Sequence, residues 1–233
     1  GDRAIVYVHN SPSRVWKKTF VSGYCFAHFL LSDFNNDGEQ EIAFGTAGRY
    51  YLINKNGDIL WQYDTGINPN KFEDIVYGGA FADIDGDGVK EIVFIAFDKV
   101  VCLKVNTGQL KWVFQAPGGD INFFPPGPVF TNFLRAYPFI ADIGGSRELE
   151  IVTADAEHVY ALNKDGKVVM RYKYVRYDPL KDRLVTPEGD SVAYPYTSKR
   201  FIFADIDGDG KGELVGSHVV GPSRIVHRVF CLE

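Results

Sequence analysis

The chain has 233 residues, of which 45% are hydrophobic and 24% are charged, and its formal net charge is −5. This length and apolar content suffice for one large all-β domain or two small ones. No apolar run approaches the roughly 18 residues of a membrane-spanning helix, and no basic stripe points to nucleic acid, so we expect neither direct membrane insertion nor a nucleic-acid partner.

Two short β-prone segments separated by turn residues occupy residues 1–20. Asn10 precedes Trp16 by the same spacing that separates Asn106 from Trp112, so this opening matches the last two strands of a later repeat. The sequence does not begin with methionine, and we therefore expect a processed or excised piece of a longer protein.

A nine-residue acidic loop then recurs four times, at residues 33–41, 83–91, 142–150 and 205–213. Three copies keep Asp or Asn at positions 1, 3 and 5, Gly at position 6 and Glu at position 9. A glycine turn brings such oxygen side chains together, and hard oxygen donors at this density suit Ca²⁺. An EF-hand needs glutamate at position 12 and flanking helices, whereas these loops lie between β-prone runs. Asp and Gly are also common in ordinary surface turns, but three intact copies favour a calcium site on a β-hairpin.

Each loop belongs to a longer repeat, because the first aspartates are 50, 59 and 63 residues apart. A turn glycine and then a large apolar residue follow at nearly constant offsets: Gly57 and Trp61, Gly108 and Trp112, Gly166 and Met170. The repeat therefore reads strand a, acidic loop, strand b, short loop, strand c, glycine turn, strand d. Four antiparallel strands per repeat are typical of a β-propeller blade, so the sequence predicts an all-β propeller of four-stranded blades.

We assign residues 1–20 to the trailing c–d strands of a blade, residues 21–72, 73–128 and 129–190 to three blades, and residues 191–233 to a partial blade. About four blades are thus expected in this chain. Three architectures stay open: an arc of a propeller with about six to eight blades, a four-bladed ring, or an arc paired with another chain. Unpaired blade edges favour aggregation, so missing blades or another chain are expected partners.

The loop Asp-x-Asp-x-Asp-Gly-x-x-Glu between two strands, once per blade, resembles the FG-GAP/VCBS repeat of integrin α-like propellers. The resemblance implies three calcium ions, each held by loop side chains and by the main-chain carbonyl at position 7. The implied ligands are Asp33, Asn35, Asp37, Glu39 and Glu41; Asp83, Asp85, Asp87, Val89 and Glu91; and Asp205, Asp207, Asp209, Lys211 and Glu213.

The loop at residues 142–150 departs from this pattern, because Gly144 and Ser146 replace two ligands and Arg147 replaces the turn glycine. We expect no calcium beside Asp142. The Arg147 guanidinium is expected to lie between Asp142 and Glu150, where it would supply part of the missing positive charge.

Ligand binding is expected in the d–a connections, which run roughly over residues 64–77, 115–137 and 174–200, and in the b–c loop near residues 217–224. Loops on a rigid scaffold carry binding residues, and aromatic side chains with arginine are typical of interface hot spots. The candidates are Phe123, Phe124, Arg135, Tyr177, Tyr196 and Arg200. Packing over the blades is the alternative role of the aromatic residues.

These features together predict an extracellular, calcium-stabilised propeller that acts as an adhesion module and binds a protein or a glycan. Weak calcium sites suit the cell surface or a secretory or periplasmic lumen, where the ion is abundant. Scattered histidines and the lack of a nucleophile elbow, P-loop or zinc motif favour a binding module over an enzyme. The propeller of a polysaccharide-acting, lyase-like enzyme and a structural subunit of a surface assembly stay open as alternatives.

Overall fold

The computed structural model describes residues 3–10, 13–21, 28–46, 48–66, 76–117, 134, 136–143, 145–155, 157–173, 176–178, 180, 183–185, 191–192, 201–209, 212–220 and 226–232. These residues form strands and turns, and no helix occurs among them. Within this part of the chain, therefore, no helix has the length and apolar character needed to cross a bilayer.

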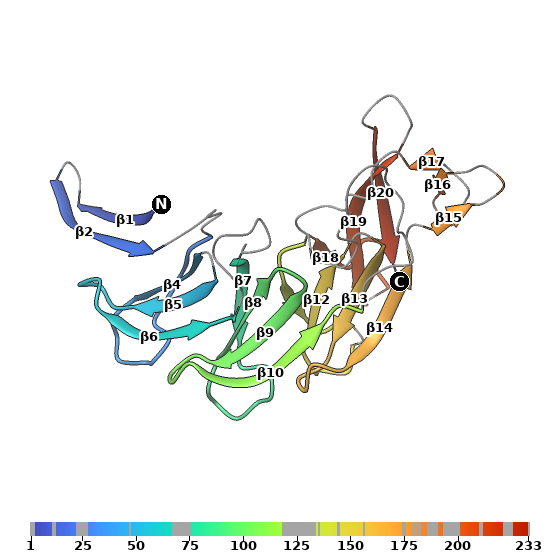
Figure 1. Cartoon of the computed structure of the whole chain (residues 1–233). Coiled ribbons are helices and arrows are strands. Elements are labelled where there is room, and N and C mark those ends of the chain that lie inside the picture. Colours follow the sequence, from blue (N-terminus) through green and yellow to red (C-terminus); the bar gives the residue numbers. More distant parts are fainter. Residues whose placement is uncertain are drawn as a thin grey trace. The chain divides into compact units, whose positions relative to one another are not determined.

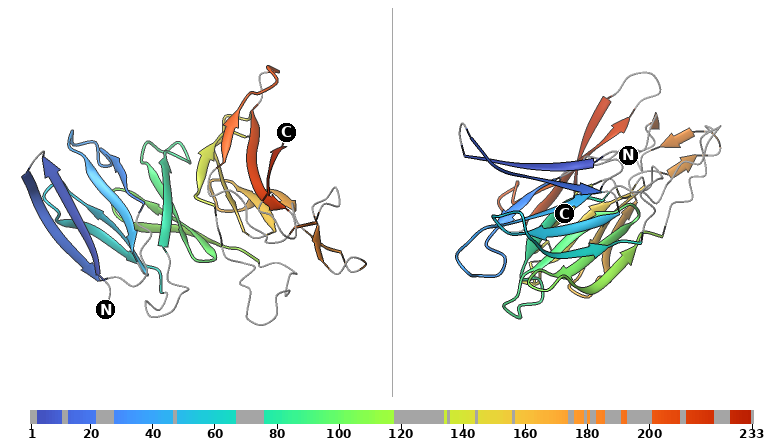
Figure 2. Two further views of the ribbon diagram at one scale, coloured as in Figure 1. Left: turned by 90° about the horizontal axis from the view of Figure 1, so that it is seen from above. Right: turned by 60° about the vertical axis from the view of Figure 1, so that its left-hand side comes forward.

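The described strands form six antiparallel sheets, and in each of them the strands lie in chain order (Figures 1 and 2). The first sheet is the hairpin of β1 (Arg3–Asn10) and β2 (Ser13–Val21). The second contains β3 (Leu30–Ser32), β4 (Glu41–Thr46), β5 (Arg49–Ile53) and β6 (Ile59–Asp64). The third contains β7 (Val76–Ala82), β8 (Glu91–Ala96), β9 (Lys99–Lys104) and β10 (Gln109–Gln115).

The fourth sheet contains β11 (Phe139–Ala141), β12 (Glu150–Ala154), β13 (His158–Leu162) and β14 (Val168–Lys173). The fifth is a small sheet of β15 (Arg176–Asp178), β16 (Arg183–Val185) and β17 (Ser191–Val192). The sixth contains β18 (Ile202–Ala204), β19 (Glu213–Val220) and β20 (Val226–Leu232). The predicted all-β fold of four-stranded antiparallel meanders is confirmed for the second, third and fourth sheets.

The chain divides into two compact units, residues 1–113 and residues 114–233, with the boundary inside β10. The first unit holds the first three sheets, and the second unit holds the last three.

Burial follows the strand order within each four-stranded sheet. Every residue of β8, β12 and β13 is buried, whereas β6, β10 and β14 alternate between exposed and half-buried positions. Inner strands are covered on both faces and therefore read as continuous apolar runs, while an outer strand keeps one face in solvent. The b and c strands thus supply the core and the d strands supply the rim.

Large aromatic side chains fill the space between the second and third sheets. Tyr50 stacks on Phe94 with ring centroids 4.1 Å apart and an interplanar angle of 11°. Phe34 meets Phe81 edge-on at 4.9 Å. A Cβ on Gly45 would lie 2.6 Å from the Val76 carbonyl oxygen, so this position must stay small where the two sheets approach.

The glycine and tryptophan that recur at fixed offsets form a contact between successive sheets in the first unit. The Trp61 indole N–H donates to the Val105 carbonyl oxygen at 2.6 Å, and Trp16 donates to the Lys55 carbonyl oxygen at the same distance. Each ring lies against the turn glycine of the next sheet. A Cβ added to Gly108 would lie 2.8 Å from the Trp61 ring, and a Cβ added to Gly57 would lie 3.2 Å from the Trp16 ring. The sequence spacing thus reflects an inter-sheet contact as well as a hairpin turn.

The connection at residues 174–200, expected as a loop, contains the small sheet β15–β17. Its first two strands pair from Arg176 opposite Val185 to Asp178 opposite Arg183. The intervening sequence carries Pro179 and Asp182, which are turn-forming residues, so the segment has its own hairpin signal.

Candidate metal centre

All four acidic loops connect a first strand to a second strand in the same register. The last residue of the first strand pairs with the glutamate that begins the second, and the four pairs are Ser32 with Glu41, Ala82 with Glu91, Ala141 with Glu150, and Ala204 with Glu213. One hairpin geometry therefore presents every loop, including the degenerate one.

The glutamate at position 9 is buried and hydrogen-bonded inside each loop. Exposure is 2% for Glu41, 0% for Glu91, 8% for Glu150 and 6% for Glu213. Its Oε2 accepts the main-chain N–H at position 2, at 2.8, 3.0, 2.9 and 2.7 Å from the first loop to the fourth. Since one carboxylate oxygen holds the loop closed, Oε1 is the atom that can serve an ion.

The aspartate at position 1 organises the turn from the other side. Asp83 accepts the N–H groups of Gly86 and Gly88 at 2.8 and 2.9 Å. Asp33 accepts those of Asp37 and Gly38 at 3.1 and 2.9 Å. These main-chain bonds fix the position of both carboxylates inside their turns.

Two positions in each turn adopt the left-handed conformation where it is described. At position 6 the φ angles are +89° for Gly38, +86° for Gly88 and +69° for Arg147. At position 4 they are +62° for Asn36, +77° for Gly86, +66° for Gly145 and +82° for Gly208. Sequence reasoning found the first of these positions and missed the second, although Gly or Asn at position 4 of every loop was the available signal.

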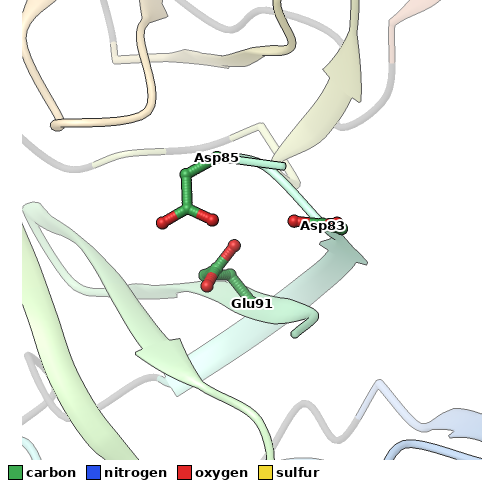
Figure 3. A group of neighbouring side chains, drawn as sticks. All are labelled: Asp83, Asp85 and Glu91. Carbon is green, nitrogen blue, oxygen red and sulfur yellow. The ribbon is translucent and has the colours of Figure 1, made fainter. Parts of the chain in front are cut away.

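Two loops bring three carboxylates together. One oxygen each from Asp83, Asp85 and Glu91 lies within 4.8 Å of the others, and the same holds for Asp205, Asp207 and Glu213. Figure 3 shows the Asp85 and Glu91 carboxylates lying close together, with that of Asp83 beside them. Each group combines two exposed aspartates with a buried glutamate, so an ion would have an open side toward solvent. These acidic groups can hold a metal ion, and their all-oxygen donor set fits Ca²⁺ better than softer metals.

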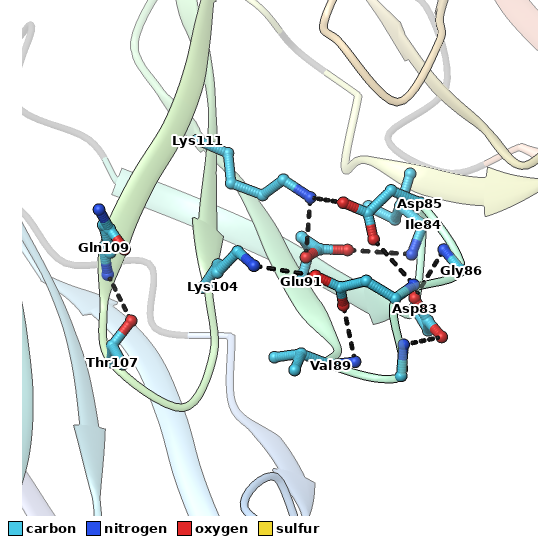
Figure 4. A network of polar contacts seen from close by, with 12 residues as sticks. Asp83, Ile84, Asp85, Gly86, Val89, Glu91, Lys104, Thr107, Gln109 and Lys111 are labelled. Atoms are coloured by element: carbon cyan, nitrogen blue, oxygen red, sulfur yellow. Dashed lines mark hydrogen bonds and ion pairs between the residues drawn. The ribbon is translucent and has the colours of Figure 1, made fainter.

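The second loop also contains two lysines from its own sheet (Figure 4). Lys111 on β10 contacts Asp85 Oδ2 and reaches Glu91 Oε1 at 2.9 Å, and Lys104 on β9 reaches Asp87 Oδ2 at 2.9 Å. Burial alone would lower the pKa of Lys111, but its hydrogen bonds to Asp85 and Glu91 raise that pKa to about 12. The hydrogen bond between Lys111 and Asp85 also lowers the pKa of Asp85. Sequence reasoning missed both lysines because they lie 17 and 26 residues beyond their partners.

The first loop has one contact between its own side chains and two contacts with lysines outside it. Asn35 Nδ2 donates to Asp37 Oδ2 at 2.9 Å, and Lys55 pairs with Glu39 Oε1 at the same distance in an exposed setting. Lys90, at position 8 of the second loop, donates to the Asp33 carbonyl oxygen at 2.9 Å. The loops of the two adjacent sheets are thus in direct contact.

The degenerate third loop keeps the turn, but Arg147 takes part in it through its main chain and not through its guanidinium. Asp142 accepts the main-chain N–H groups of Ser146 and Arg147 at 3.0 and 2.8 Å. Among the described residues, the Arg147 guanidinium forms no ion pair with Asp142 or Glu150, so its predicted place between them was wrong. Arg147 contributes its main-chain N–H and a left-handed φ of +69°, and its side chain is exposed.

Several predicted site residues lie outside the described part of the chain. They are Phe123, Phe124, Arg135, Tyr196, Arg200 and the implied ligand Lys211. Tyr177 lies in β15, where the backbone is described. The remaining implied ligands lie in the first, second and fourth loops as the sequence placed them, and their assignment as ligands stays a prediction.

A buried polar cluster at the β12–β13 turn was missed from the sequence. Asp155 and Glu157 are both 0% exposed. Asp155 Oδ1 accepts the N–H groups of Glu157 and His158 at 2.7 Å each, and its Oδ2 accepts the Tyr160 hydroxyl at 2.6 Å. Burial and the negative charge of Asp155 raise the pKa of Tyr160. The short Asp-x-Glu-His segment has no metal-ligand spacing, and no other local pattern indicates this network.

The outer strand β14 closes this cluster with two cations. Arg171 Nη2 lies 3.0 Å from His158 Nε2, and Lys173 Nζ lies 3.4 Å from Glu157 Oε2. A guanidinium can only donate, so His158 Nε2 accepts and the proton of the neutral ring sits on Nδ1. That nitrogen lies 3.6 Å from Asp155 Oδ1. The internal pairing of these groups marks the cluster as structural.

Comparison with known proteins agrees with this geometry. Residues 33–94, which span the first two acidic loops, match the family described as FG-GAP-like repeat. No curated protein matches the sequence.

Among solved structures, rhamnogalacturonan lyase YesW superposes with a TM-score of 0.58 at 13% identity, covering 99% of this chain and 42% of the lyase. The exotype rhamnogalacturonan lyase YesX gives 0.51 at 15% identity, covering 97% and 52%. BBS1N, solved in complex with ARL6DN, gives 0.51 at 8% identity, covering 91% and 59%. The chain thus spans less than two thirds of each of these proteins, and at these identities the likeness concerns the fold. The chain is an all-β protein of propeller-type blades that carries an FG-GAP-like repeat at residues 33–94.

Proposed function

We propose that the chain is a calcium-stabilised β-propeller module, and that its connecting loops bind a protein or a glycan outside the cell. The observation that carries the calcium proposal is the repeated hairpin, which places a buried glutamate and two aspartates within 4.8 Å in two loops. Carboxylates at this separation repel one another strongly unless a cation neutralises them. An ion that binds only the folded hairpin adds its binding free energy to the stability of the fold.

In this proposal the intact loops bind Ca²⁺ through side chains at positions 1, 3, 5 and 9 and a carbonyl at position 7. The main-chain hydrogen bonds at positions 1 and 9 orient the carboxylates before the ion arrives, which reduces the ordering required on binding. The loop at residues 142–150 lacks side-chain oxygen at position 3 and carries a hydroxyl at position 5, so it remains without calcium.

The binding role is argued from the composition of the connecting segments. The connecting segments of this chain are rich in aromatic residues and arginine, and loops of a rigid all-β scaffold are where ligands bind. Extracellular calcium modules operate with modest affinity because the ion is abundant there, so we place the protein at the cell surface or in a secretory or periplasmic lumen. The ligand class that we propose is a protein or a glycan.

The calcium proposal is tested by native mass spectrometry and thermal unfolding, each in Ca²⁺ and in EDTA. A free Ca²⁺ concentration 100 times Kd stabilises by about 2.7 kcal/mol per site, which raises Tm by about 5 to 10 °C for a domain of this size. The double variant Asp205→Asn with Asp207→Asn should lose one calcium ion. The matched control Asp142→Asn, in the degenerate loop, should leave the ion count unchanged. Equal Tm values in both media with no bound ion would remove the proposal.

A propeller of a polysaccharide-acting enzyme is the second candidate, and the fold likeness to two rhamnogalacturonan lyases is the observation that favours it. Incubation of the chain with rhamnogalacturonan, followed by ultraviolet detection of the unsaturated product of β-elimination, separates the two. Turnover would establish the enzyme, whereas saturable binding without turnover would support the binding module.

A further inference from the structure

The geometry points to a second feature of the acidic loop at residues 83–91: we propose that Lys111 is an internal cation that competes with a divalent metal ion for this loop. Metal binding there then requires the Lys111 ammonium to leave. The inference rests on the proposed calcium function and specifies how one of its sites is regulated.

The contacts of Lys111 coincide with the atoms that a metal would use. Its Nζ contacts Asp85 Oδ2 and lies 2.9 Å from Glu91 Oε1. Asp85 and Glu91 are two of the three residues in the carboxylate group of this loop. The other oxygen of Glu91 is already bound to the Ile84 N–H at 3.0 Å, so Lys111 holds the oxygen that an ion needs.

A second lysine extends the same arrangement. Lys104 Nζ lies 2.9 Å from Asp87 Oδ2, and Asp87 stands at position 5 of the loop. The pKa of Lys104 is raised by this hydrogen bond. Three of the four acidic side chains in the loop are therefore paired with ammonium groups from β9 and β10 (Figure 4).

The first and third repeats carry no lysine at the positions of Lys111 and Lys104, so the repeat itself does not require these lysines. The residue before Trp112 is Lys111, whereas Leu60 precedes Trp61 and Val169 precedes Met170, and both are about half exposed. The position of Lys104 is taken by asparagines whose Oδ1 atoms accept main-chain N–H groups of their own turns: Asn54 from Asn56 and Asp58, and Asn163 from Asp165 and Lys167.

The fourth loop has a comparable carboxylate group. Asp205, Asp207 and Glu213 meet within 4.8 Å, as in the second loop. Within the described part of the chain, no lysine or arginine forms an ion pair with Asp207 or Glu213. In the second loop, by contrast, Lys111 pairs with the residues at both of these positions, Asp85 and Glu91.

An ammonium group and a divalent ion cannot share the same carboxylate oxygens, because like charges at contact distance repel. The loop consequently has two states: one closed by Lys111, which is stable without metal, and one closed by the metal with Lys111 in solvent. We expect the Lys111 ammonium to raise the Ca²⁺ concentration that fills the second loop at least tenfold.

The test replaces Lys111 with the residue of a sister repeat. In Lys111→Leu, calorimetric titration with Ca²⁺ should show the weakest carboxylate site tightened at least tenfold. Native mass spectrometry should then show one additional ion at limiting Ca²⁺, and adding Asp83→Asn should remove it. Lys99→Leu is the control, because it also removes one positive charge. Lys99 lies opposite Ala96, at the end of the β8–β9 hairpin that is far from the loop. The Ca²⁺ affinities of this variant should stay within twofold of those of the parent. Lys111→Arg retains the cation and should retain the weak site.

Thermal unfolding supplies a readout that does not depend on ion counting. Lys111→Leu should lower Tm in EDTA, where its carboxylates lose their cation, and the deficit should disappear in saturating Ca²⁺. If the parent binds calcium and neither Lys111→Leu nor Lys111→Gln changes any affinity, the inference is wrong and the calcium proposal stands. If no variant binds calcium and the Tm deficit is equal in both media, the calcium proposal itself fails. Should Lys111→Leu not fold, Lys111→Gln carries the same test.

Discussion

The contact between Trp61 and the turn of the next sheet can be tested by adding one methyl group. Gly108 has a φ of +69°, and a Cβ there would lie 2.8 Å from Trp61 Cδ2 and 2.9 Å from Cγ. Gly108→Ala should therefore strain the backbone and push the indole off the turn. Displacement of the ring removes the hydrogen bond from Trp61 to the Val105 carbonyl oxygen, now 2.6 Å long.

Two contributions set the size of the effect. An L-residue in the left-handed conformation costs about 1–2 kcal/mol. Loss of the indole hydrogen bond and of ring packing adds about 1–2 kcal/mol. Gly108→Ala is thus expected to lower the free energy of unfolding by about 2–4 kcal/mol in total.

Gly66→Ala is the matched control, because Gly66 has a φ of +72° but a Cβ there would meet nothing within 4 Å. It should show the backbone contribution alone, about 1–2 kcal/mol. Urea unfolding monitored by tryptophan fluorescence gives both values when the slopes with denaturant agree. Equal destabilisation by the two substitutions would show that Trp61 does not depend on Gly108, and the inter-sheet contact would lose its energetic role.

Other groups buried in the sheets give further expectations. The Tyr50 hydroxyl is buried and has no hydrogen-bond partner among the described residues, so Tyr50→Phe should be neutral or should stabilise by up to about 1 kcal/mol in urea unfolding. Asp155→Ala leaves three buried donors unpaired and should cost about 3–5 kcal/mol, whereas a cost below about 1 kcal/mol would contradict the network. Burial raises the pKa of both Tyr50 and Tyr160. Stability should therefore hold below the ordinary tyrosine pKa of about 10 and fall as the pH rises above it, less so in the Tyr50→Phe, Tyr160→Phe double variant. Burial raises the pKa of Cys102 to about 12, so iodoacetamide should label it at pH ~8 only after unfolding, as read by peptide mass spectrometry.

The repeat and its strands were predictable because each carries a local signal. Acidic loops between apolar runs and turn glycines such as Gly57 act within a few residues of one another. The hairpin register followed from the same spacing, so Glu41 and Glu91 begin their strands where the loop pattern places them. The match of residues 33–94 to the FG-GAP-like repeat agrees with that interpretation.

The features that escaped prediction depend on contacts between distant residues. Lys111 reaches Asp85 across 26 positions, and nothing in the intervening sequence indicates that its side chain turns toward the loop. Trp61 meets Val105 across 44 positions, so its spacing from Gly57 was visible but its partner was not. The prediction for Arg147 was wrong for a related reason. Its charge suggested an ion pair with Asp142 and Glu150, but its main-chain N–H donates to Asp142 Oδ2 instead.

We propose that the intact acidic loops hold calcium and that the degenerate loop does not. An anomalous difference map from crystals grown in CaCl₂ tests it directly, because each ion is located beside its own ligands. We expect a peak about 2.3–2.6 Å from the carboxylate oxygens of Asp205 and Asp207. We expect further peaks at Asp33 and, once Lys111 has been displaced, at Asp83, and none beside Asp142. A map without a peak at any intact loop would show that these loops do not bind calcium, and a peak beside Asp142 would show that the degenerate loop does.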